Sequence, residues 1–98
     1  MAANGVRGEV TAILAGAERR LCLTLGALAE IETGLHLEGL SGLPTRMRTL
    51  SARDLLVVLA ALLRGGGEQR LARELDSVGV EPREAAEAVA KAFAAAAG

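Results

Sequence analysis

Aromatic residues are nearly absent from this sequence of 98 residues, because Phe93 is the one aromatic side chain and neither Trp nor Tyr occurs. Proteins that bind single-stranded nucleic acids stack the bases on such rings, so their scarcity argues against a binding site for single-stranded nucleic acid. Cysteine is equally scarce, with Cys22 alone. A lone cysteine rules out an internal disulfide and favours a reducing compartment. The N-terminus also lacks a signal-peptide pattern, so we expect a cytoplasmic protein.

The sequence has no excess of charge of either sign. It contains 11 basic and 12 acidic residues and has a formal net charge of -1 at pH 7. No strong field is therefore expected to attract nucleic acid or an anionic membrane. The longest apolar run, Leu55 to Leu63, is far shorter than the roughly 20 residues of a transmembrane helix. The sequence predicts a protein that does not act in a membrane.

Groups of chemically active side chains are lacking as well. Cys22 falls on the strand face opposite a row of leucines, and His36, the single histidine, falls in an irregular stretch. Glu30 and Glu32 lie two positions apart, and residues at that spacing on a helix do not face each other. The glycines at 65–67 are not followed by the Lys and Ser or Thr of a phosphate-binding loop. We therefore expect no catalytic residue, no cofactor and no metal, and hence no enzyme.

The residues that are plentiful are Ala, Leu and Val, which favour a mostly helical chain. An alternation of apolar and polar residues at 9–14 and 19–25 predicts a β-hairpin. The turn falls at Ala15-Gly16-Ala17, where Gly16 can adopt a positive φ. The two strands are expected to turn one face each toward the core, formed by Val10, Ala12 and Leu14 on the first and Leu21, Leu23 and Leu25 on the second.

The clearest helix is predicted for residues 52–64. Ser51 and Asp54 have the spacing of a capping box at its start, and Gly65-Gly66-Gly67 ends it. The run from Leu55 to Leu63 has no polar residue, and a helix that is apolar all round is usually buried on most sides. We therefore place this helix at the centre of the fold, with Leu56, Leu59 and Leu63 in the core.

Shorter helices are predicted on either side of the central one. One spans about 26–33 and ends at Gly34, and residues 35–50 are irregular, with room for one helical turn. Another spans 68–77. The last begins with Pro82, which suits a first helical turn, and its apolar stripe consists of Ala86, Val89, Ala92, Phe93 and Ala96. Together these elements predict one mostly helical α+β domain over residues 1–98, in which the hairpin packs against three to four helices.

Two features are candidates for contact with other proteins. Leu71, Leu75 and Phe93 could form an exposed apolar surface, although packing in the core is the default for such residues. The three glycines, Gly65, Gly66 and Gly67, could form a hinge between neighbouring helices. Arginines near both ends of the central helix are interleaved with acids, which favours a solvated surface over a nucleic-acid site.

The order of several motifs resembles a known family. Gly8-Glu9-Val10 stands near the start, and the run from Leu23 to Glu32 joins the hairpin to the first helix. A third motif runs from Ser51 to Gly67, and an Ala-rich end carries Phe93. In combination these motifs resemble the small gene transfer agent tail proteins, which are grouped with phage tail assembly chaperones. The likeness covers nearly the whole chain, although the family favours Asp-Gly where this chain has Ala15-Gly16.

This resemblance implies a role in building a phage-like tail, without an enzymatic activity or a cofactor. The implied partners are other tail proteins, namely the tape measure or the tail tube, and a homo-oligomer is left open. We expect a chaperone that binds the tape-measure protein or guides polymerisation of the tail tube. The alternatives are a structural component incorporated in the phage-like particle and, from another class, a small nucleic-acid-binding regulator.

Overall fold

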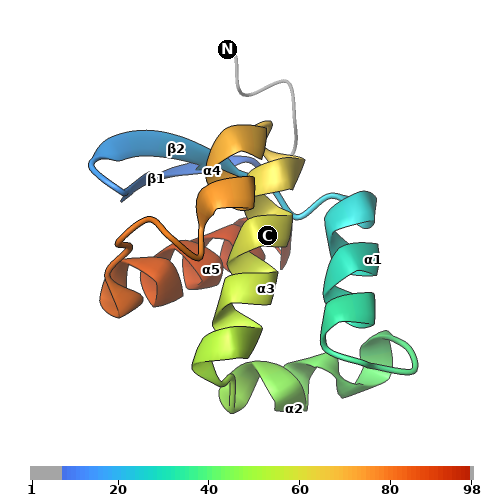
Figure 1. Ribbon diagram of the computed structural model, residues 1–98. Coiled ribbons are helices and arrows are strands. Elements are labelled where there is room, and N and C mark those ends of the chain that lie inside the picture. Colours follow the sequence, from blue (N-terminus) through green and yellow to red (C-terminus); the bar gives the residue numbers. More distant parts are fainter. Residues whose placement is uncertain (1–7, 98) are drawn as a thin grey trace.

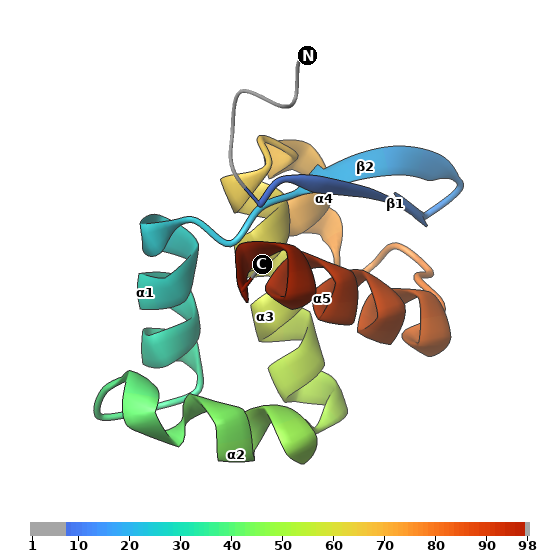
Figure 2. The same ribbon diagram turned by 180° about the vertical axis from the view of Figure 1, so that it is seen from behind.

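The computed structural model describes residues 8–97 and shows a β-hairpin packed on a layer of helices (Figures 1 and 2). The hairpin consists of β1 (Val10–Leu14) and β2 (Ala17–Leu21). The helices are α1 (Leu25–Gly34), a 3₁₀ turn η2 (Leu40–Gly42), α2 (Leu43–Arg48), α3 (Ala52–Gly65), α4 (Gln69–Glu74) and α5 (Pro82–Ala97). The predicted α+β class, its N-terminal hairpin and its central helix are confirmed.

The hairpin is closed by a two-residue turn at Ala15 and Gly16. Both residues have a positive φ, 54° and 81°, as a type I′ turn requires. The strands are antiparallel with Leu14 opposite Ala17 and Val10 opposite Leu21. β2 therefore begins and ends earlier than the alternation of residues 19–25 predicted, because the chain leaves the strand after Leu21 to begin α1.

α1 begins where the second strand was expected to continue. The side chain of Thr24 accepts a hydrogen bond from the backbone N–H of Ala27 at 3.0 Å and so caps the helix. Leu25 is consequently the first residue of α1, with 81% of its surface exposed, while Leu23 is half-buried. The prediction that Leu25 belongs to the core was wrong.

α3 is the hub of the fold, because it packs against α1, α4, α5 and β2. Ser51 and Asp54 form the predicted capping box, in which the backbone N–H of Asp54 donates to the Ser51 hydroxyl at 3.1 Å. Both strands and each α-helix contribute to one core around it. Its largest fully buried side chains are Leu14, Leu21, Ile31, Leu35, Val58, Leu59, Leu62 and Leu63.

The buried stripe of α5 differs from the predicted one. Its inward side chains are Ala85, Ala88, Val89 and Ala92, with Phe93 half-buried beside them. Ala86 and Ala96 are exposed, so their assignment to the apolar stripe was wrong. More than half of the residues of this helix are Ala, and composition alone therefore leaves the orientation of the helix about its axis weakly specified.

The three glycines after α3 have separate structural tasks. Gly67 has a φ of 90°, and the N–H groups of Gly67 and Glu68 donate to the carbonyls of Arg64 (3.1 Å) and Leu63 (2.8 Å). These bonds form a Schellman motif, which ends the helix. A Cβ on Gly65 would collide with the carbonyl of Cys22, and one on Gly66 with the backbone of Arg20 and Leu21.

The end of α3 therefore fits directly against the chain that leaves β2. The backbone N–H of Cys22 donates to the carbonyl of Leu62 at 3.0 Å, and that of Arg20 donates to the Glu68 carboxylate at 3.0 Å. This contact joins the hairpin to the helical layer. The hinge proposed for these glycines stays a prediction, and glycine has a packing reason at Gly65 and Gly66 that does not depend on it.

Replacing Gly66 with Ala should destabilise the fold, because the added methyl group would have to displace backbone atoms of β2. Overpacking of this kind costs about 1–3 kcal/mol or more. Gly79 is the matched control, since a Cβ there meets no atom within 4 Å. Urea denaturation of Gly66→Ala and Gly79→Ala should show a large loss for the first and little change for the second. Equal midpoints would contradict the close packing.

Leu59→Ala should lower the free energy of unfolding by about 2–5 kcal/mol, because Leu59 is fully buried and the deletion leaves a cavity. Leu25→Ala makes the same chemical change at an exposed site and should change stability by less than about 0.5 kcal/mol. The two variants can be compared by chemical denaturation under identical conditions. A loss well below about 1 kcal/mol for Leu59→Ala would contradict its place in the core.

Candidate functional site

The residues that the sequence suggested as an exposed binding surface lie in the core. Leu71 and Leu75 are 5% and 4% exposed, and Phe93 is half-buried against the same cluster. Leu71 lies on α4 and Leu75 directly follows that helix, which spans only Gln69–Glu74 within the predicted 68–77. Leu71 and Leu75 therefore pack in the core, which is the default for such residues, and they do not form the exposed patch that was the alternative. A partner of the folded chain needs other residues as its main contacts.

An open groove of about 830 Å³ lies on the other side of these elements, between α1, α3 and α4. Figure 1 shows α1 on one side of α3, α4 beside its upper end and α5 crossing behind it, which leaves much of the near side of α3 uncovered by these helices. The α3 residues that line the groove are Arg53, Leu56, Val57, Ala60 and Arg64. Apart from the adjacent pair Leu56 and Val57, these residues follow one another at intervals of three or four, which places them on one stripe of the helix.

This stripe explains why Leu56 was placed wrongly in the predicted core. α1, α4, α5 and β2 bury most of the circumference of α3, but α1 and α4 do not meet over Leu56, which keeps 36% of its surface exposed. Val57 and Ala60 beside it are half-buried. A helix that is apolar all round thus keeps one apolar stripe open, and an uncovered stripe of this kind commonly marks an interaction site.

Charged side chains border the groove. At one end the Nε of Arg64 donates to the Oε1 of Glu30 at 2.8 Å and so bridges α3 to α1. Arg53 on α3, and Arg73 and Asp76 on the α4 side, also line it. Within residues 8–97 the side chains of Arg53, Arg73 and Asp76 form no hydrogen bond or ion pair. The groove therefore has an apolar floor and two arginines able to meet a partner's carboxylates.

A second, smaller recess adjoins the groove at Leu56. It measures about 210 Å³ and lies between the first turns of α3 and α5. Its lining is aliphatic, and the side chains are those of Ala52, Leu55, Leu56, Leu59, Val80, Pro82 and Ala85. Leu56 lines both spaces. An apolar side chain that passes over Leu56 from the groove would therefore enter an apolar environment.

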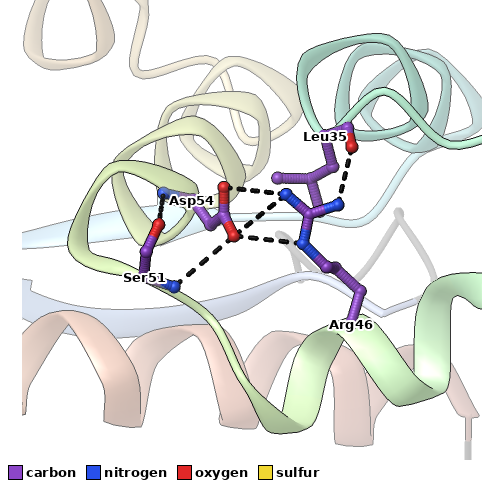
Figure 3. A network of polar contacts seen from close by, with 4 residues as sticks. All are labelled: Leu35, Arg46, Ser51 and Asp54. Carbon is purple, nitrogen blue, oxygen red and sulfur yellow. Dashed lines mark hydrogen bonds and ion pairs between the residues drawn. The ribbon is translucent and has the colours of Figure 1, made fainter.

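A network around Arg46 fixes the other end of the α1–α3 pair (Figure 3). The guanidinium of Arg46, on α2, donates to both oxygens of Asp54 at 3.1 Å and to the carbonyl of Leu35 at 2.7 Å. Asp54 also closes the capping box with Ser51. Arg46 thus connects the end of α1 to the start of α3. Together with the Arg64–Glu30 pair, it helps to set the distance between these two helices.

Cys22 and His36 lie apart from the groove. The thiol of Cys22 is buried, and its burial, followed by the negative charge of Glu9, raises the pKa of this thiol, which opposes nucleophilic chemistry. His36 is exposed with a φ of 59°, just after the C-terminus of α1. Among the described residues no group of three or more His, Cys, Asp or Glu side chains is arranged to hold a metal ion. None of the helices described over 8–97 is long and apolar enough to span a membrane.

The family comparison agrees with the motif order. The model of the family described as "Phage tail tube protein, GTA-gp10" matches residues 7–98. The chain belongs to this family. No curated protein and no solved structure shows a significant match to it. Membership in the GTA-gp10 family relates the chain to the tails of phage-like particles and to other proteins of such tails.

Sequence reasoning missed the groove in this GTA-gp10 family member, although a weak signal for it was present. Arg53 and Arg64 flank the apolar run of α3 and lie eleven positions apart, close to three helical turns. This spacing places both arginines and Leu56 on one side of the helix. The pattern indicates which side of α3 combines apolar residues with flanking arginines. It does not show whether α1 and α4 cover that side.

Arg46→Ala should lower the free energy of unfolding by about 1–3 kcal/mol, because it removes charge-assisted hydrogen bonds to Asp54 and Leu35. Arg46→Lys should have a free energy of unfolding between those of the unchanged chain and Arg46→Ala, since an ammonium group cannot bind both carboxylate oxygens in the same planar way. Ser51→Ala should cost about 1 kcal/mol through the lost cap. Arg48→Ala is the control, because Arg48 is exposed and makes no ion pair with the described residues. Equal denaturation midpoints for Arg46→Ala and Arg48→Ala would exclude a structural role for the network.

Proposed function

We propose that this chain is a tail assembly factor without enzymatic activity that holds a helical segment of another tail protein, the tape-measure protein, in the groove beside α3. The observation that carries the proposal is the uncovered apolar stripe of α3, with Leu56 at its centre, in a member of a tail protein family. Grooves between helices bind amphipathic helices through anchors at successive turns. We place this activity in the cytoplasm, before or during assembly of the particle.

The hairpin supports an assembly factor over a component of the tube wall. Subunits that polymerise through their sheets need extended free edges, and here each strand has five residues. One edge is contacted by Lys91, which donates to the carbonyl of Thr11 at 2.7 Å, and the other by Glu68, which accepts from the N–H of Arg20. Short strands, each with one outward-facing backbone group already bonded to a side chain, are less suited to pairing with further strands.

A structural component of the tail is the second candidate function. The description of the matched family as a tail tube protein favours it. The two candidates differ in where the chain is found after assembly. A chaperone is released and is recovered with unassembled tail proteins, whereas a structural component copurifies with finished particles in a fixed ratio to the tube.

Co-expression with the tape-measure protein tests the proposed function directly. We expect the tape measure to be more soluble in the presence of the chain and to be recovered with it in a pull-down. Because the floor of the groove is apolar and only a few charged side chains border it, the complex should weaken modestly, and not steeply, between low and moderate salt and should form with a negative heat-capacity change.

The result that rejects the chaperone is equally clear. It is a tape measure that is equally soluble with and without the chain, with no complex at concentrations on the order of 10 μM. Recovery of the chain in purified particles would then favour the structural component, and steeply salt-dependent DNA binding would instead indicate a nucleic-acid regulator.

A further inference from the structure

From the structure we infer that the groove and the adjoining aliphatic recess form one docking surface for an amphipathic helix with two properties: a bulky apolar anchor residue and acidic residues on one flank. This inference rests on the proposed function and specifies the chemistry of the bound segment. Three features of the surface support this inference: the length of the groove, the volume and aliphatic lining of the recess, and the sign of the unpaired charge.

The length of the stripe sets the length of the bound helix. Arg53 and Arg64 stand at the two ends of the α3 stripe, and eleven residues of helix rise about 16 Å. A partner helix lying along α3 therefore contacts the groove over about three turns. Leu56 lies one turn from the Arg53 end, beside the recess.

The recess selects a bulky apolar side chain at that turn. An apolar cavity of about 150 Å³ accommodates a benzene-sized ring, and the recess measures about 210 Å³ with an aliphatic lining. Phe93, the chain's own aromatic residue, packs against the core cluster and does not line the recess. A Phe or Leu side chain of the partner can therefore bury its apolar surface in the recess. Side chains buried in this way at the centre of an interface dominate binding energy.

The unpaired charges select acidic residues beside the anchor. Arg53 lies on α3 one turn before Leu56, and Arg73 lies on α4 and lines the groove from that helix. Neither side chain is paired within residues 8–97. Asp76 is the one unpaired acid of the lining in this part of the chain, and Glu30 is already bound to Arg64. Two arginines against one aspartate leave a positive excess, which complements carboxylates and repels a basic helix.

The same charges disfavour a second copy of this chain as the occupant. A symmetric dimer through the groove places the same patch on both sides of the interface. Such an interface would hold four unpaired arginines, Arg53 and Arg73 of each copy, against two unpaired aspartates, Asp76 of each copy. This excess of positive charge over a shared apolar floor is unfavourable, so the surface fits a different, acidic partner better than itself.

Three designed peptides test the surface without needing the natural partner. The first is a four-turn amphipathic helix with one leucine stripe, a central Phe anchor and Glu residues flanking it. The second replaces the Glu residues with Lys, and the third replaces the Phe with Ala. Binding to the full chain is measured by fluorescence anisotropy. We expect the first peptide to bind, and each of the other two to bind about tenfold more weakly.

Variants of the chain identify where the peptide binds. Leu56→Asp should weaken binding of the first peptide at least about tenfold, and Ala52→Leu should do the same by filling the recess from its exposed rim. Arg53→Glu should reduce or reverse the preference for Glu over Lys. Ile13→Asp is the control for Leu56→Asp, since Ile13 is 57% exposed on the hairpin. Arg83→Glu, on the exposed start of α5, is the control for Arg53→Glu.

Every outcome bears on the inference once circular dichroism shows that each variant is folded. No binding of the first peptide, equal binding of all three, or unchanged binding to Leu56→Asp would overturn it. Self-association of the free chain that Leu56→Asp abolishes in sedimentation would assign the surface to a second copy instead. Peptide binding without capture of the tape measure rejects the proposed function and leaves the surface in place. Capture that Leu56→Asp does not affect keeps the role as an assembly factor but rejects the groove as the site that holds the tape measure.

Discussion

The fold depends on one backbone contact, the passage of residues 20–24 across the glycine-rich end of α3. Gly65 and Gly66 let the carbonyls of Cys22 and Arg20 approach where any side chain would collide. The Cys22 N–H meets the Leu62 carbonyl there, and two residues later Thr24 caps α1. The hairpin, the last turn of α3 and the first turn of α1 are therefore placed by a single junction. The position of α1, and with it one wall of the groove, follows from how closely this junction packs.

Local physics explains the parts of the fold that the sequence predicted. The capping box at Ser51 and the glycine stop after α3 depend on residues within one turn of each other. Local sequence is therefore enough to predict where this helix begins and ends. Alternation likewise placed Val10, Ala12 and Leu14 correctly on the inner face of β1, with Leu14 fully buried. It failed at Leu25 because a Thr cap three positions after the end of β2 competed with the strand pattern, and the helix formed instead.

The candidate site was less predictable, because it depends on which apolar residues remain uncovered. Leu71 and Leu75 have the same residue type as Leu56, and all three stand at helical spacing from other leucines. Burial separates them, and burial depends on where α1, α4 and α5 pack around α3. Only the structure shows that α5 covers one side of the central helix while α1 and α4 leave another open. The flanking arginines, Arg53 and Arg64, were the nearest sign of that open side in the sequence.

The open stripe also bears on why a domain of this size keeps an apolar helix at its centre. A chain of about 100 residues buries a limited share of its surface, and covering Leu56 fully would require another helix. Polar residues on that stripe would serve the isolated domain as well or better, since they would be hydrated. An aliphatic stripe beside an aliphatic recess gains stability when a second chain covers it. The contacts at both ends of the α1–α3 pair, the bidentate Arg46–Asp54 pair and the more exposed Arg64–Glu30 pair, favour a preformed surface. Binding then requires ordering of the partner helix more than rearrangement of this chain.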